Sequence, residues 1–180
     1  MAIINIKSKE RKPAALLFFM FFSIVSATIT GASVRDAVFL TQFDKSYLPV
    51  MFITIAVVMA GVIALYKKLT AGQDQIFVIS ISGALFSISL FLLQSNLSGL
   101  FIPVLYIWME VVTILSIFQF WILAGEIFNA RQAKRIFTLL GAGGSFAGMG
   151  AGFGIKPFVS TFGSENLLFL TIFFIGISVV

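Results

Sequence analysis

The chain has 180 residues, of which 59% are hydrophobic and 11% are charged, and its formal net charge at pH 7 is +5. This composition lies far outside the average of soluble domains and is typical of a protein embedded in a bilayer. Because the sequence contains no Cys and no His, it excludes thiol chemistry, disulfides, imidazole bases and the usual zinc sites. We expect no metal and no cofactor.

Apolar stretches of about 20 residues, the length that crosses ~30 Å of hydrocarbon, recur along the chain with short polar breaks between them. Continuous apolar runs that must satisfy their backbone groups in lipid form helices. The sequence therefore predicts one all-α transmembrane bundle over residues 1–180. Its five complete spans and one partial span are expected at about 14–40, 48–66, 76–93, 100–128, 136–155 and 166–180.

The first span contains two charges, Arg35 and Asp36. An ionisable side chain within a span costs a few kcal/mol, so it usually faces a protein interior or a water-filled cavity and has a partner. Thr28 and Gly31 lie on nearly the same helical face as Arg35, and this polar stripe could line a cavity. Asp36 is turned about 100° from Arg35, so we expect the two to have different partners. The alternative for Arg35 is a cation that snorkels to the lipid headgroups.

A basic start before an apolar run also fits a cleaved signal peptide, with small residues for cleavage at 30–32. We favour a retained first helix, because the run is longer than a usual signal core and apolar sequence resumes after Asp36.

Lys and Arg residues outside the spans gather on one side of the predicted membrane. They are Lys7, Lys9, Arg11, Lys12, Lys67, Lys68, Arg131, Lys134 and Arg135. The other side has only Lys45 and Lys156, so the N-terminus is expected on the cytoplasmic side of the membrane. Because topology explains these cations, we expect no nucleic-acid partner. The run 129–135 is interpreted as a topogenic loop, with binding of an anionic solute or of lipid heads as the alternative.

The fourth span carries one carboxylate, Glu110, about ten residues from its outer end. Arg35 lies about five residues from the outer end of the first span, so their depths differ by ~8 Å at 1.5 Å per residue, which a long arginine could largely bridge. Trp121 and Thr113 roughly share the helical face of Glu110, whereas Gln119 and Glu126 lie opposite. Glu110 is either a structural ion-pair partner or a residue that contacts substrate, and Glu126 is interpreted as a solvated helix end.

The fifth span is rich in glycine, with Gly144, Gly148 and Gly152 four residues apart. Small residues at this spacing let helix backbones approach closely, so we expect this span to pack tightly against a neighbour. A nucleotide-binding glycine loop is the alternative, but Phe146 stands where the third glycine is needed and no strand precedes it.

Three segments carry a family resemblance: SVRDAVFL at 33–40, WMEVV at 108–112 and FQFWILAGEIFNARQAKRIFTLLGAGG at 118–144. Together they resemble the amino-terminal half of the ATP/ADP translocases of plastids and obligate intracellular bacteria, and of their bacterial relatives in the major facilitator superfamily. The resemblance implies the first six helices of a twelve-helix rocker-switch carrier. It also implies functional roles for Arg35 and Glu110. The translocases tend to have Lys where this chain has Arg35, and segment 67–75 lacks the glycine-aspartate-arginine signature of other facilitators.

The expected function is a carrier that exchanges nucleotides such as ATP and ADP, or a related anionic metabolite, by alternating access. Arg35, Asp36, Glu110 and Trp121 are the expected substrate-binding and translocation residues. The expected partners are the bilayer, the anionic substrate, and a carboxy-terminal half or a second copy, because 166–180 is too short for a span and the chain is expected to be part of a longer one. The alternative is a non-transporting facilitator-like domain that scaffolds or senses for a soluble region beyond residue 180. The acidic residues are scattered and form neither a carboxylate pair nor a nucleophile arrangement, so we do not expect an enzyme.

Overall fold

The computed structural model of the protein describes residues 8–95 and 97–179, and over these residues it is helical without strands. The elements are α1 (Ser8–Gln42), the short 3-10 helix η1 (Lys45–Tyr47), α2 (Leu48–Thr70), α3 (Gln75–Gln94), α4 (Phe101–Ile127), α5 (Ala130–Phe162) and α6 (Leu167–Ser178). Each predicted span is thus confirmed as a helix, and α5 is longer at both ends than the predicted 136–155. Lys7 and Val180, which the prediction included, lie outside the described residues.

Five of the helices, α1 to α5, are long and apolar enough to cross a membrane. Large hydrophobic side chains cover the outside of the bundle, among them Val57 on α2, Phe91 on α3 and Phe153 on α5. Water would disfavour so much exposed apolar surface, whereas lipid tails solvate it. The chain is therefore a helical membrane protein.

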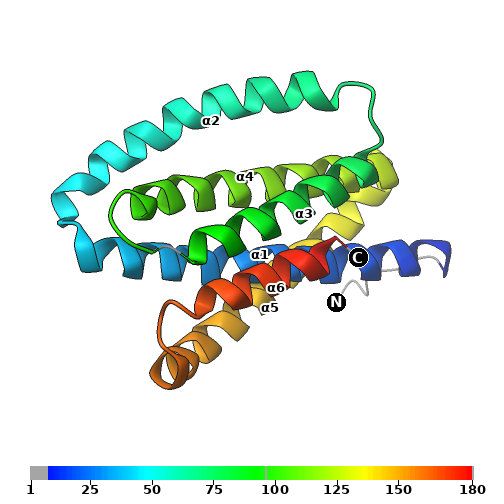
Figure 1. Cartoon of the computed structure of the whole chain (residues 1–180). Coiled ribbons are helices and arrows are strands. Elements are labelled where there is room, and N and C mark those ends of the chain that lie inside the picture. Colours follow the sequence, from blue (N-terminus) through cyan, green and yellow to red (C-terminus); the bar gives the residue numbers. More distant parts are fainter. Residues whose placement is uncertain (1–7, 96, 180) are drawn as a thin grey trace.

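The longest helix, α1, lies at the centre of the bundle and packs against α4, α5 and α6 (Figure 1). Its buried face includes the small residues Ser26, Ala27 and Gly31, which let neighbouring helices approach closely. The Thr30 hydroxyl lies 2.9 Å from the Thr171 hydroxyl and joins α1 to α6 by a hydrogen bond. By contrast, α2 lies at the edge of the bundle, where it packs mainly against α4 (Figure 1).

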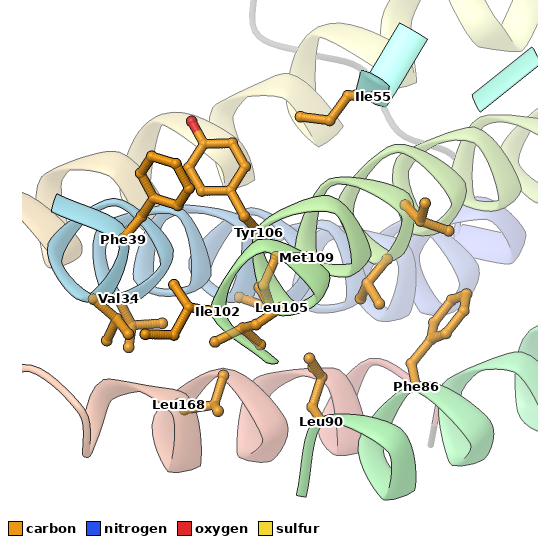
Figure 2. Packing of buried hydrophobic residues seen from close by; sticks show 14 of the residues in the cluster. Val34, Phe39, Ile55, Phe86, Leu90, Ile102, Leu105, Tyr106, Met109 and Leu168 are labelled. Atoms are coloured by element: carbon orange, nitrogen blue, oxygen red, sulfur yellow. The ribbon is translucent and has the colours of Figure 1, made fainter. Parts of the chain in front are cut away.

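Two buried hydrophobic clusters hold the helices together. The larger one joins α1, α2, α3, α4 and α6, and Figure 2 shows its centre around Leu105 and Met109 of α4. In this cluster the Phe39 and Tyr106 rings lie 4.8 Å apart between their centroids. The second cluster lies nearer the first turns of α1 and includes Leu17, Phe120 and Leu140. The two clusters leave the polar residues of the spans between packed helices.

Side chains cap the helices where the chain turns. The Ser46 backbone N–H donates to Asp44 Oδ1 at 2.8 Å, and this hydrogen bond holds the pKa of the Asp44 carboxyl below its usual range. Asp74 caps α3 in the same way. Asn129 and Gln132 form a capping box at the start of α5, which satisfies backbone donors that the first turn leaves unpaired.

The interpretation of 129–135 as a loop is therefore wrong. Arg131, Lys134 and Arg135 lie on the first turns of α5, since the capping box starts the helix directly after Asn129. The discrepancy arises because the apolar part of α5 begins near residue 136, whereas the helix itself begins earlier, at Ala130.

The glycines of α5 divide into a packed pair and an exposed set. A Cβ built on Gly143 would lie 2.9 Å from the Phe18 carbonyl oxygen, and one on Gly144 would lie 3.0 Å from the Phe21 ring. At Gly148 and Gly152 no described atom outside the helix backbone lies within 4 Å of such a Cβ. Within the described residues Gly144 packs against α1, whereas Gly148 and Gly152 have no neighbour, because α5 crosses α1 obliquely and the helices diverge beyond the crossing (Figure 1).

Candidate functional site

The first span and the fourth span meet through Arg35. Its Nε donates to Asp36 Oδ1 at 2.9 Å, and its Nη1 donates to Glu110 Oε2. The bridge from Arg35 to Glu110 confirms that a long arginine can span the difference in depth. The expectation of separate partners for Arg35 and Asp36 is wrong. A rotation of about 100° separates two Cβ atoms, but the flexible arginine side chain reaches back to the neighbouring carboxylate.

Tyr106 completes this group, which we call the Arg35 cluster: Arg35, Asp36, Tyr106 and Glu110. The Arg35 guanidinium carbon lies 4.5 Å from the centroid of the Tyr106 ring, a distance at which the ring quadrupole attracts the cation. The sequence analysis did not select Tyr106. The available signal was its position four residues before Glu110, which places both on one face of α4.

The Arg35 cluster contains one formal positive charge and two formal negative charges. The Arg35 side chain is 12% exposed, against 50% for Asp36 and 30% for Glu110. Arg35 is therefore largely covered by its neighbours, and its carboxylate partners are more accessible. Removing one partner from such a group leaves another charge uncompensated in apolar surroundings, which is costly. An anion that takes the place of either carboxylate would accept from the same guanidinium nitrogens.

Trp121, the other predicted translocation residue, is in a different place. It lies eleven residues after Glu110, about 16 Å along α4 at 1.5 Å per residue. Its ring packs against Phe21, Phe120 and Phe137 with centroid distances of 5.4, 5.1 and 5.2 Å. The structure therefore gives Trp121 an aromatic packing role and does not bring it to the Arg35 cluster.

The residues of the polar stripe predicted on α1 do not all face the same surroundings. Thr28 lines a small cavity together with Thr113 of α4, as expected of a stripe that faces a cavity. Gly31 instead lies against the end of the Met109 side chain. Its function is close packing between α1 and α4. Among the described residues no group of three or more Asp, Glu, His or Cys side chains could hold a metal ion.

A second polar group joins the start of α1 to the start of α5. The buried Glu10 side chain accepts a hydrogen bond from Gln132 Nε2 at 2.9 Å and pairs with Arg135 Nη2 at 3.3 Å. Arg131 and Lys134 are exposed, so only Arg135 of the three predicted basic residues is used inside the bundle. Nothing local indicated this pair, because its members lie 125 positions apart.

We expect Glu10→Ala to lower the free energy of unfolding by about 1–3 kcal/mol, since it leaves the hydrogen-bonding groups of Gln132 and Arg135 without their buried acceptor. Chemical unfolding in detergent micelles measures the change. Lys9→Ala is the matched control, because Lys9 is exposed on the same helical turn. Equal stability of the two variants would contradict a structural role for Glu10.

The fold and the Arg35 cluster define a class: a helical membrane protein in which a partly buried arginine bridges carboxylates of two apolar helices. No protein-family model, curated protein or solved structure matches this chain.

Proposed function

We propose that the chain is a bundle of a facilitator-type carrier that exchanges nucleotides, or a related anionic metabolite, across the bacterial inner membrane. The observation that supports this most is the position of Arg35. A cation that lies inside an apolar bundle, held by partly exposed carboxylates, is a binding group for an anion that can displace them. The resemblance of the segments around Arg35 and Glu110 to the nucleotide translocases supports the nucleotide as substrate.

The chemistry of the guanidinium suits a phosphate. Its planar fork of five N–H donors matches two phosphate oxygens at once, and in the structure two of its nitrogens donate to Asp36 and Glu110. A phosphate that takes the Nη1 donor releases Glu110. Because Arg35 lies on α1 and Glu110 on α4, this exchange of partners breaks a link between two helices. Substrate binding is thereby coupled to helix movement, as alternating access requires.

One arginine does not balance a multiply charged nucleotide, and the Arg35 cluster itself has a formal charge of −1. The proposal therefore includes a second six-helix bundle, from the same chain or from a second copy, that supplies further positive charge. The exposed part of α5 from Gly148 to Lys156 offers small residues for close approach of another helix and a lysine beside them.

The test is uptake of radiolabelled ATP into proteoliposomes that contain the full gene product. We expect rapid uptake into vesicles preloaded with ADP and little uptake into empty vesicles, because exchange requires a counter-substrate. Protein-free vesicles are the control for leakage. If folded, inserted protein moves neither nucleotides nor other phosphorylated anions, the proposal is wrong and the scaffold or sensor function takes its place.

A further inference from the structure

Two small cavities lie inside the bundle, between α1 and its neighbours. The hydroxyl cavity is lined by polar residues of three helices, namely Thr28 of α1, Thr113 and Ser116 of α4, and Thr171 and Ser178 of α6. The amide cavity is lined by Gln119 and Ser116 of α4 and by Ser178, with apolar residues of α1 and α3 around them. Each has a volume of about 10 Å³ open to a water molecule.

Gln119 supplies an unsatisfied group in the amide cavity. Its residue is only 3% exposed, and its Oε1 accepts a hydrogen bond from Ser82 Oγ at 3.0 Å. Its Nε2 is buried and has no hydrogen-bond partner among the described residues. Rotating the amide by 180° does not help, since Oε1 would then be the unpaired atom. A buried donor without a partner is costly, and a bound water molecule is one way to satisfy it.

The two cavities share part of their walls. Ser116 and Ser178 line both, so one hydroxyl-bearing boundary separates the spaces. The volume of each cavity matches a single water molecule, which needs two to four polar partners. Gln119 Nε2 is a donor for one water. The Ser178 hydroxyl donates to the Ile175 carbonyl oxygen at 2.7 Å, so its oxygen can accept from a water, and the Ser116 hydroxyl lies in the wall of both cavities.

We infer that the bundle holds a pair of internal water molecules, one in each cavity, and that Gln119 Nε2 donates to the water in the amide cavity. The cavities are too small for a metabolite. No carboxylate lines either of them, so a cation there would lack a counter-charge. Water is neutral and both donates and accepts, which fits hydroxyls beside an amide N–H. This inference does not depend on the proposed transport function.

The two waters lie beside polar residues of α4 that follow Glu110 along the helix. Thr113, Ser116 and Gln119 follow Glu110 at steps of three residues, about 4.5 Å each along the helix. These residues wind around α4, from the face that carries Glu110 to the opposite face that carries Gln119, and the waters lie along the later part of this polar path. The waters also fill polar gaps between α1, α4 and α6, where direct contacts between side chains are missing.

Radiolytic footprinting of the full gene product in lipid tests the inference. A short X-ray pulse converts bound water to hydroxyl radicals, which oxidise adjacent methionines to the sulfoxide. Met109 lines the hydroxyl cavity and is 1% exposed, whereas Met51 and Met59 line neither cavity and are 8% and 6% exposed. Internal water predicts oxidation of Met109 several-fold faster than that of Met51 and Met59. A dry interior predicts the reverse order and would overturn the inference.

A variant tests whether the radicals that oxidise Met109 come from water in the two cavities. Ser116→Leu places a larger apolar side chain in the wall that both cavities share, so Met109 oxidation should fall to the level of Met59. Ser145→Leu, at an exposed position on α5, is the matched control and should change nothing. Persistent oxidation of Met109 in a folded Ser116→Leu protein would also overturn the inference. If that variant does not fold, the order of the three methionines in the unsubstituted protein still decides.

A separate measurement tests whether Gln119 Nε2 donates to a water molecule. In solid-state NMR of the protein in bilayers, magnetisation should pass from water protons to one buried side-chain amide signal that disappears in Gln119→Leu. Absence of this transfer in the unsubstituted protein would contradict the role of Gln119 as the water donor.

Discussion

Arg35→Gln should reduce nucleotide exchange by about 10- to 100-fold, the effect expected when one charged hydrogen-bonding partner worth about 1.5–3 kcal/mol is lost. In the proposed carrier Arg35 is the cation that receives the substrate phosphate, and glutamine offers neither its charge nor its paired donors. The measurement is the initial rate of ATP uptake into ADP-loaded proteoliposomes. Glu110→Gln should also reduce exchange strongly, because Glu110 is the partner that Arg35 regains when the substrate leaves.

The Arg35 cluster supplies the controls. Arg35→Gln removes the cation from both Asp36 and Glu110, so it should also lower stability, and adding Glu110→Gln should restore part of the loss. Exchange that stays low in this restabilised double variant separates a transport role from a folding defect. Arg35→Lys keeps the charge but lacks the planar fork of donors, so its exchange rate should lie between those of Arg35→Gln and the unsubstituted protein. Normal exchange in both single variants would contradict the roles assigned to these residues.

Gly143→Val should lower the free energy of unfolding by about 1–3 kcal/mol, the usual cost of forcing extra atoms into a packed contact. The new Cβ would lie 2.9 Å from the Phe18 carbonyl oxygen, and a backbone atom of α1 cannot move aside as a side-chain end can. Separation of α1 from α5 is the expected consequence. Chemical unfolding in detergent micelles measures the change.

Gly148→Val is the matched control for this prediction. It makes the same chemical change on the same helix, so the effect of a β-branched residue on helix propensity is shared. No described atom outside the helix backbone lies within 4 Å of a Cβ at Gly148, so its stability should stay close to that of the unsubstituted protein. Equal losses in both variants would show that contact with α1 is not responsible for the effect at Gly143.

Hydropathy along the chain was sufficient to locate the helices. Lipid leaves a chain few ways to satisfy its backbone groups, so hydropathy located α1 to α4 closely and placed α5 and α6. The same reasoning selected Arg35 and Glu110, since a charge within an apolar span needs a partner whatever the details of packing. Hydropathy underestimated the length of α5, because it detects where a helix is apolar and not where the helix begins and ends.

Which residues meet could be seen only in the packed bundle. It joined Arg35 to both carboxylates and added Tyr106, it moved Trp121 into an aromatic cluster, and it paired Glu10 with Arg135. It also separated Gly143 from Gly148, although both are glycines of one helix. The physical reason is the same in each case. Helix crossing and rotation depend on the summed packing of side chains from distant segments, and no local pattern in the sequence specifies that sum.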